Sequence, residues 1–542
     1  MPKATKIYIN TWEESHELAK NPATDRHYLK VANAVKTALS IHPVLRKQLP
    51  DLLLSKLACY LTYYLEDMVS GGGQWDLFRR TSRERYGQPV PLFLADSEDY
   101  FDEEVNELDV VFLIWYFMKS WWKEEDKPFF HPYEPMFREF AELAFSVLSE
   151  AYEEVPENPN VRDFLAYDPQ DFYFFEIGMT LGSSLAGIWM VQPELSQRTH
   201  LLMESLAERP GMNPEDVYQE LVQHMLVWRM GPFGWTVRDW LAGLLPEGHT
   251  LIPALKAPFH FVTDYWEPLS GTEDTVELRN ASTHMKATVR HEDWGDIDGS
   301  RLTPKKNMVK AALAYWDHGW RSLGNEEAYQ YHEPSLETRY GDKDNLWQYQ
   351  SWPELAELAH ARYRKEAEQF REFSGGRKLL YLPAGKWSAL EAAVELYFAE
   401  TDPEERKTRT WENLKEHLPE GKSPDDQLDP DQPIVAYFSE QAGLIPITKA
   451  LGAIPDPENP SFKAENVAES FWAAIMTEEV PWHFVRFLLD NYQKEYDFLD
   501  TVPWPGLISH LDLLMEISKG HMYHPHPRLQ MKDIEEYLAQ NT

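Results

Sequence analysis

The chain has 542 residues, with 89 Asp and Glu against 52 Lys and Arg, which gives a formal net charge of -37. A field of this sign repels nucleic-acid phosphates and anionic lipid headgroups, so we expect no direct nucleic-acid or membrane partner. Hydrophobic residues make up 43% of the chain, which supports folded cores, and a chain of this length predicts several domains.

Cysteine content and apolar runs indicate the compartment. Cys59 is the single cysteine, so no intramolecular disulfide can form, and its apolar surroundings are typical of an inert core thiol. The N-terminus shows no hydrophobic signal segment, and the longest apolar run, residues 110–118, is shorter than the roughly 20 residues of a membrane-spanning helix. We therefore expect a cytoplasmic protein.

The first part of the chain predicts a large helical domain. Leu53, Leu57, Leu61 and Leu65 recur at helical spacing, and the glycines at 71–73 end that helix. Proline-containing joints separate the neighbouring segments. The predicted helices span residues 25–39, 51–70, 99–122, 135–153, 172–191, 196–207 and 214–230.

Beyond residue 258 the periodicity changes to the alternation that is typical of strands. The alternating segments lie at residues 259–266, 276–278, 285–289, 308–316 and 320–323. Five short strands within about 65 residues predict a small β-barrel or a curled sheet.

The last part of the chain predicts an α/β unit. An acidic, proline-bearing stretch at 416–433 has the composition of a linker. The predicted elements are a helix at 352–373, a strand at 379–382, a helix at 387–399, a hairpin at 434–439 and 444–447, and three terminal helices. The strand at 379–382 is expected to pair with the hairpin across the linker.

The sequence therefore predicts an α+β fold that is predominantly helical, with a large helical N-terminal domain, a small β-barrel-like insert and a C-terminal α/β unit. The predicted domains are a helical domain at 1–245, a small β-rich domain at 246–326, a helical segment with one strand at 327–415, an acidic linker at 416–433, and a C-terminal hairpin with helices at 434–542.

Several short motifs are recognisable along most of the chain. They are Lys6–Ile9, Trp12, Thr24–Asp25, Tyr28–Lys30, Ala32–Asn33, Tyr64–Asp67, Glu103–Asn106, Phe112–Tyr116 and Ala453–Pro460. Together they resemble an uncharacterised domain-of-unknown-function family of Bacteroidetes-type bacteria. The resemblance implies a bacterial, cytoplasmic protein and brings no catalytic residues with it.

Carboxylates are the leading candidates for chemistry. Eight of them lie in residues 96–109 with no Lys or Arg among them, and Glu103 and Glu107, four residues apart, share a helix face. If that helix packs beside the one that ends near Glu66 and Asp67, the carboxylates can hold a divalent ion such as Mg²⁺ or Ca²⁺. The candidate metal ligands are Glu66, Asp67, Glu103, Glu104 and Glu107.

A structural role is the alternative for the same residues. Acidic side chains in the first turn of a helix complement its dipole, at about 0.3 to 1 kcal/mol each. Glu66 and Asp67 can also form ion pairs with Arg79 or Arg80 across the glycine turn. The paired Glu-x-x-His motifs of di-iron bundles are missing, which weighs against a metal site.

Histidines form a second candidate group. His521, His524 and His526 are close enough in sequence to gather a transition metal, but the prolines among them favour a solvated, extended segment. Glu13-x-x-His16 and Glu357-x-x-His360 are single pairs, of the kind that 19 histidines produce by chance. No cofactor is predicted, and a divalent metal ion stays open only at the carboxylates.

Motifs for nucleophiles and for phosphate binding are missing. The chain has no Gly-x-Ser-x-Gly elbow, no Gly-x-x-x-x-Gly-Lys-Ser/Thr loop and no Gly-x-Gly-x-x-Gly after a strand. The sequence favours a non-catalytic protein-interaction or regulatory module with a protein partner, because acidic surfaces and 20 Trp suit recognition. The alternative is a metal-dependent hydrolase or nuclease that uses the carboxylate cluster.

Overall fold

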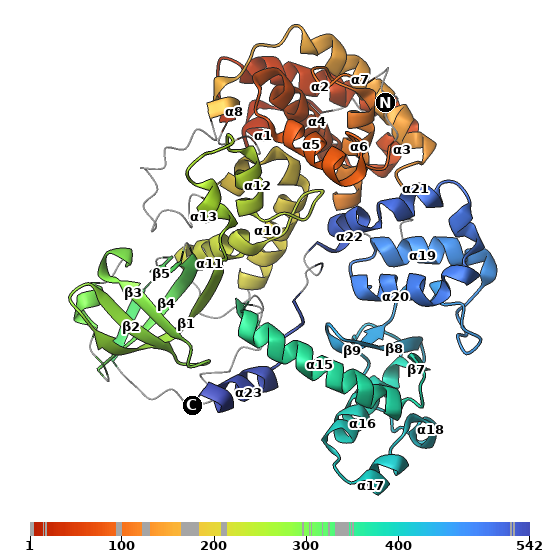
Figure 1. Ribbon diagram of the computed structural model, residues 1–542. Coiled ribbons are helices and arrows are strands. Elements are labelled where there is room, and N and C mark those ends of the chain that lie inside the picture. The colour runs from red at the N-terminus through yellow and green to blue at the C-terminus, as the bar shows by residue number, and fades with distance from the viewer. Residues whose placement is uncertain are drawn as a thin grey trace. The chain divides into compact units, whose positions relative to one another are not determined.

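The computed structural model contains many helices and two β-sheets, which confirms the predicted α+β, mostly helical fold class (Figure 1). The chain forms two compact units, Met1–Ala257 with Val502–His521 (unit 1) and Pro258–Thr501 with Met522–Thr542 (unit 2). The structure describes residues 5–14, 16, 19–93, 100–121, 130–163, 181, 184–207, 214–294, 298–302, 304, 306–316, 318–323, 326–330, 346, 348–349, 352–520, 523 and 526–541.

Unit 1 is built from helices. They are α1 (Ile9–Glu14), α2 (Asp25–Ile41), α3 (Pro43–Gln48), α4 (Asp51–Ser70), α5 (Gln74–Tyr86), α6 (Glu107–Trp121), α7 (Pro135–Tyr152), α8 (Pro159–Asp163), the 3₁₀ turn η3 (Trp189–Val191), α10 (Gln192–Ala207), α11 (Pro214–Val227), α12 (Val237–Leu244), α13 (Ile252–Lys256), α21 (Trp504–Ser509) and α22 (Leu511–Lys519). The predicted helix at 172–191 lies mostly outside the described residues.

Helix α4 is the central element of unit 1. It contacts α2, α5, α6, α7 and α8, and its side chains from Leu57 to Asp67 are all buried. A helix that is apolar on nearly all sides needs neighbours on all sides, which is why other helices surround it. Gly71 ends α4 with a φ of 66°, the left-handed conformation that glycine adopts without steric cost.

Helix α6 is shorter than the sequence predicts. It begins at Glu107 instead of Asp99, and the residues just before it form a loop. The side chain of Asn106 accepts a hydrogen bond from the backbone N–H of Phe101 (3.0 Å) and donates to the carbonyl oxygens of Phe101 and Glu104 (2.8 Å each). Because a short amide side chain competes for backbone groups in this way, the loop replaces the predicted first turns of the helix.

Unit 2 contains a closed barrel. Its strands are β1 (His260–Gly271), β2 (Thr275–Asn280), β3 (Lys286–Arg290), β4 (Asn307–Trp316), β5 (Gly319–Ser322) and β6 (Glu327–Gln330). The order β1-β2-β3-β5-β4 closes through the pairing of β1 with β4, and β6 pairs with the other edge of β4. The predicted small barrel is confirmed, and β6 is a strand that the alternation pattern missed.

The register of β1 and β4 explains the barrel core. Val262 pairs with Leu313 and Trp266 with Val309, and all four side chains are fully buried. Alternate residues of a strand face opposite sides, so this register places the apolar residues of both strands in one interior.

A second, smaller sheet lies in the same unit. Its strands are β7 (Leu379–Pro383), β8 (Pro433–Ser439) and β9 (Gly443–Ile447), in the order β7-β8-β9. The predicted pairing of β7 with the hairpin is confirmed, with Leu380 opposite Ala436. The intervening acidic stretch packs against the turn after β7, since the N–H of Gly385 donates to the carbonyl of Pro430 (2.8 Å).

Further helices complete unit 2. They are α15 (Pro353–Phe373), α16 (Trp387–Ala399), α17 (Pro403–Thr408), α18 (Trp411–Leu414), α19 (Val467–Met476), α20 (Trp482–Tyr492) and α23 (Met531–Asn541). The two ends of α15 lie in different cores. Leu355 packs with the barrel, whereas Phe370 and Phe373 pack with the smaller sheet.

In the part of the chain that the structure describes, no helix is both long enough and apolar enough to cross a membrane.

Candidate functional site

The last turn of α4 carries two carboxylates into the interior of unit 1. Glu66 is 1% exposed and Asp67 is 2% exposed. Both were predicted as metal ligands from the sequence. A buried carboxylate is costly unless it is hydrogen-bonded or paired, so its partners reveal what it does.

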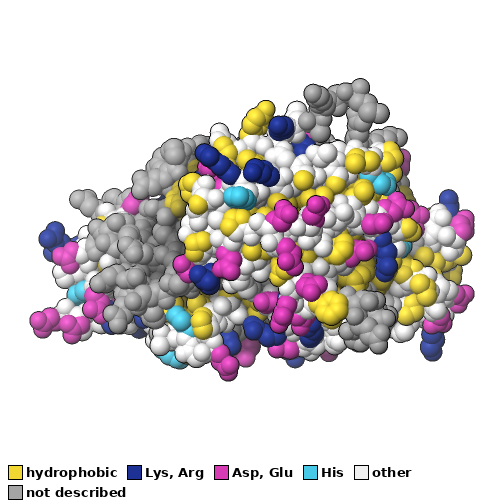
Figure 2. Space-filling view, turned by 90° about the horizontal axis from the view of Figure 1, so that it is seen from above, with side chains coloured by type: hydrophobic (Ala, Val, Ile, Leu, Met, Phe, Trp, Pro, Cys, Tyr) yellow, Lys and Arg dark blue, Asp and Glu magenta, His cyan; other side chains and the backbone are white. Residues whose placement is uncertain are grey.

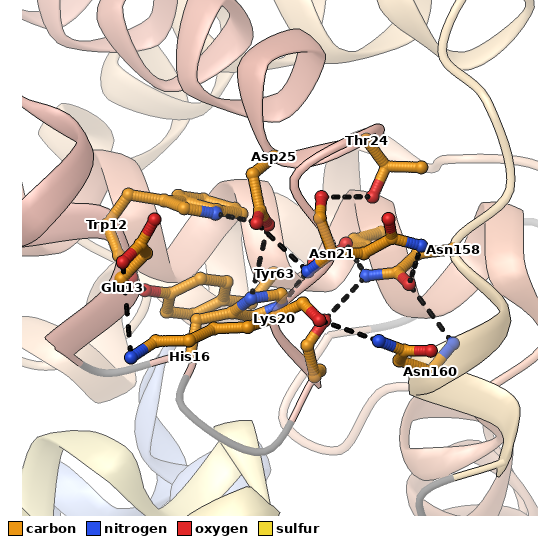
Figure 3. A network of polar contacts seen from close by, with 12 residues as sticks. Trp12, Glu13, His16, Lys20, Asn21, Thr24, Asp25, Tyr63, Asn158 and Asn160 are labelled. Carbon is orange, nitrogen blue, oxygen red and sulfur yellow. Dashed lines mark hydrogen bonds and ion pairs between the residues drawn. The ribbon is translucent and has the colours of Figure 1, made fainter.

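Glu66 uses both of its oxygens. Oε2 lies 2.6 Å from Nε2 of His16, and Oε1 accepts a hydrogen bond from Nδ2 of Asn158 (2.7 Å). On the other side of the imidazole, Nδ1 of His16 lies 3.7 Å from Oδ1 of Asp25 (Figure 3). A buried histidine thus lies between two buried carboxylates.

Aromatic rings enclose this histidine. The ring of Tyr63 stacks on the imidazole with centroids 5.1 Å apart, and the ring of Trp12 lies 4.9 Å away (Figure 3). Trp12 also donates from Nε1 to Asp25 (3.0 Å), and Asp25 accepts from the N–H of Asn21 (2.9 Å). The surroundings of the His16 imidazole are therefore aromatic around the ring and polar at its edge.

Asn158 connects the cluster to a third segment of the chain. Its Nδ2 also donates to the carbonyl of Ala19 (2.9 Å), and its backbone N–H donates to Oγ of Ser70 (2.9 Å). We call Trp12, His16, Asp25, Glu66 and Asn158 the buried polar cluster. It ties the N-terminal segment to α4 and to the residues that precede α8.

Asp67 points to a different set of partners. It accepts hydrogen bonds from the backbone N–H groups of Gln74 (3.3 Å) and Trp75 (2.8 Å), at the start of α5. A Cβ on Gly72 would lie 2.3 Å from Oδ1 of Asp67, so only glycine leaves room for this carboxylate. Burial raises the pKa of Asp67 from 3.8 to about 7, although the two backbone hydrogen bonds oppose the rise.

Asp109 is a third buried carboxylate, in the first turn of α6. Its oxygens accept hydrogen bonds from the hydroxyls of Tyr64 (2.6 Å) and Tyr100 (2.8 Å) and from Nε1 of Trp75 (2.8 Å). Burial raises its pKa to about 6, and the hydrogen bonds limit the rise. Asp109 belongs to the acidic run in the sequence, and nothing in that run predicts its burial.

The other three predicted ligands lie at the surface. Glu103, Glu104 and Glu107 are exposed, and none of them forms an ion pair with a residue that the structure describes. Over the described ranges, no group of three or more His, Cys, Asp or Glu side chains is arranged to hold a metal ion. The structure therefore does not bring the five candidates together, and the metal site stays a prediction.

The predicted ion pairs of Glu66 and Asp67 with Arg79 or Arg80 do not form among the described contacts. Arg79 pairs instead with Asp76 and Asp102, and Arg80 donates to the carbonyl of Gly243 (3.1 Å). Glu66 and Asp67 bind other protein groups than the predicted arginines.

His16 belongs to this cluster, although the sequence analysis attributed the Glu13-x-x-His16 pair to chance. Glu13, its partner in the Glu-x-x-His pair, is partly exposed and lies 4.0 Å from Lys20 instead. The sequence signal that could have indicated His16 is its position near Trp12 and Asp25, which both belong to the recognisable motifs. Of the C-terminal histidines, His521 and His524 lie outside the described residues.

The chemistry open to the buried polar cluster is limited by the contacts that its groups already make. Its imidazole has an acidic partner on each side, and its neighbouring hydroxyl groups, on Tyr63 and Ser70, are engaged with the protein backbone. Cys59 lies on the same helix, but burial raises the pKa of its thiol to about 12, which keeps it unreactive. The cluster holds three chain segments together.

Comparison with known proteins gives one result for this part of the chain. Residues 6–266 match the model of a family described as "Protein of unknown function (DUF3843)". The match spans the N-terminal part of unit 1 and the first half of β1, which supports the resemblance to an uncharacterised domain-of-unknown-function family. No curated protein and no solved structure matches the chain.

Proposed function

We propose that the protein is a non-catalytic protein-interaction or regulatory module of the bacterial cytoplasm, and that its acidic loop at residues 100–107 binds a basic segment of a protein partner. One observation supports this most. Phe101 is 55% exposed, and it lies among the exposed side chains of Asp102, Glu103, Glu104 and Glu107. An exposed aromatic ring with an acidic rim suits a partner that presents an apolar contact ringed by Lys or Arg.

The loop that carries Phe101 is held in one conformation. Asn106 bonds both the N–H and the carbonyl of Phe101, and Tyr100 donates to the buried Asp109. Because binding costs less when the binding loop is already ordered, this rigidity favours recognition.

Acidic side chains also gather beside the loop. The hydroxyl of Tyr152, at the end of α7, donates to the carbonyl of Glu103 (2.5 Å). The pKa of Tyr152 is raised first by burial and then by the charges of Glu104, Glu103 and Glu153, which places these carboxylates around it. Figure 2 shows one face of the protein, on which acidic side chains lie among hydrophobic and basic ones.

The charges in the loop are available to a partner. Asp102 pairs with Arg83 and Arg79, but Glu103, Glu104 and Glu107 have no cationic partner in the part of the chain that the structure describes. Exposed charges of this kind raise association rates more than they raise affinity, so the binding we propose weakens with salt.

The test compares variants of the full chain as baits in lysate of its native host. Phe101→Ala and the double variant Glu103→Gln/Glu104→Gln each change the loop, and Leu396→Ala removes a side chain of similar exposure (52%) in unit 2. The expected result is a protein that wild type and Leu396→Ala retain and both loop variants lose. That protein, purified, should bind about ten-fold more weakly to Phe101→Ala and should show salt-dependent affinity. Equal retention of every captured protein by all four baits overturns the proposal.

A further inference from the structure

A cavity of about 310 Å³ lies in unit 2. Its walls come from the end of β7, the 3₁₀ turn Ala384–Lys386 and α18. This volume is at the lower end of the range for sites that bind small organic molecules.

The charge of the cavity wall contrasts with the composition of the chain. Its lining contains three cations and two carboxylates, whereas acidic residues outnumber basic ones by 89 to 52 in the whole sequence; these lining residues are Arg377, Lys386, Lys415, Glu416 and Glu458. The cavity lining therefore carries a small excess of positive charge, unlike the protein as a whole.

The three cations differ in how far they are neutralised. Arg377 and Lys415 both pair with Glu412, and Nε of Arg377 also lies 3.7 Å from Oε1 of Glu458. Lys386 forms no ion pair with any residue that the structure describes. Its ammonium group is therefore the least neutralised of the three cations and the one that attracts an anion most strongly.

Local structure fixes the position of Lys386. It ends the 3₁₀ turn and directly precedes α16, so it lies at the positive end of a 13-residue helix. The neighbouring N–H of Gly385 is held by Pro430, which keeps the turn in place. The helix dipole thus adds to the charge of the lysine.

Apolar and aromatic residues also line the cavity. Trp411 is 5% exposed and belongs to the core of the smaller sheet, and Leu418 and Leu382 flank it. Burial, and after it the charge of Asp456, raises the pKa of the Tyr381 hydroxyl, so this group stays protonated. A ligand in this cavity therefore meets both cationic and apolar side chains.

We infer that this cavity binds a small organic anion, with its carboxylate or phosphate on Lys386 and its apolar part against Trp411. This binding is independent of the acidic loop, since the cavity residues all lie in unit 2. The shared chemistry is an anionic head on a short apolar body, and carboxylate and phosphate heads are distinguished by the probes.

The test measures binding of four probes to the full chain by isothermal titration calorimetry and by ligand-observed NMR. Phenyl phosphate and benzoate carry both features, inorganic phosphate carries only the charge, and benzyl alcohol carries only the ring. Saturable binding of phenyl phosphate or benzoate, tighter than that of the other two probes, is expected. The head group that binds more tightly identifies the ligand class.

Two variants locate the site. Lys386→Gln should weaken the better probe about ten-fold or more, because a charged donor to the anion is lost. Lys407→Gln removes a lysine that is 71% exposed on α17 and pairs with Glu404, and it should leave binding unchanged. Unchanged far-UV circular dichroism confirms that both variants fold. The inference is overturned if no probe saturates, or if Lys386→Gln binds as wild type does.

Discussion

The carboxylates of unit 1 fall into two regions whose physical environments are opposite. Glu66, Asp67 and Asp109 are buried and are satisfied by hydrogen bonds, whereas Glu103 and Glu107 are exposed. Asp109 and Glu107 are only two residues apart on the same helix. The comparison teaches that a run of like residues in the sequence need not act as one site, because a helix turns about 100° per residue and sends neighbours to different surroundings.

The largest expected effect comes from the buried polar cluster. Glu66→Ala leaves His16 and Asn158 without their shared acceptor, and we expect it to lower the free energy of unfolding by about 3 to 5 kcal/mol. Urea denaturation followed by circular dichroism measures the loss. The double variant with His16→Ala should be less destabilised than the sum of the two single variants, and simple additivity would contradict the pairing.

Asp109 offers a second measure of the same region. Asp109→Asn keeps one acceptor oxygen for three donors, so at least one buried donor loses its partner, at an expected cost of about 1 to 3 kcal/mol. The same denaturation experiment checks this. If Asp109→Asn unfolds at the same urea concentration as wild type, the three donors do not depend on the carboxylate.

The pH dependence of stability follows from Asp67. Its pKa in the folded protein, about 7, lies above the ordinary value of 3.8, so the folded state binds the proton more tightly than the unfolded chain. This contribution is complete below about pH 4 and is lost as pH rises through 7, by at most about 1.4 kcal/mol per pH unit.

The variant Asp67→Asn isolates this contribution, because other groups titrate in the same range. The difference in unfolding free energy between wild type and Asp67→Asn should change between pH 4 and pH 8, in favour of the variant as pH rises. Glu103→Gln is the matched control from the exposed region, and its curve should run parallel to that of wild type. A constant difference for Asp67→Asn would mean that Asp67 has an ordinary pKa.

The smallest effect is expected at Glu107. Glu107→Gln changes an exposed side chain with no ion pair among the described residues, so we expect a shift in unfolding free energy within about 0.5 kcal/mol. Thermal denaturation at neutral pH is sufficient to detect a larger shift. If Glu107→Gln lowers the unfolding free energy as much as Asp109→Asn does, the exposed and buried carboxylates do not differ in their contribution to stability.

Much of the fold could be predicted from local patterns. The spacing of Leu57, Leu61 and Leu65 gave α4, and the alternation beyond residue 258 gave the barrel strands, because burial on one face imposes a period on the sequence. The helix at Glu107 was predicted eight residues too early, since propensity could not show that Asn106 bonds Phe101 instead of joining the helix. Boundaries of this kind depend on single side chains.

The candidate site was predicted only in part. Glu66 and Asp67 were identified, but their expected neighbours Glu103 and Glu107 are exposed, and the true partners His16 and Asn158 lie 50 and 92 residues away in the sequence. Spacing along one helix predicts which residues share a face. It carries no information about which distant segment comes to that face.

The sequence by itself determined the fold class, the acidic character and the apolar centre of unit 1, because these follow from composition and from short-range periodicity. Only the tertiary structure decided which carboxylates are buried, since burial depends on the packing of segments that are far apart in the chain. The same holds for the three cations beside Trp411, which come from residues 377 to 415 and meet only after β7, α16 and α18 have packed.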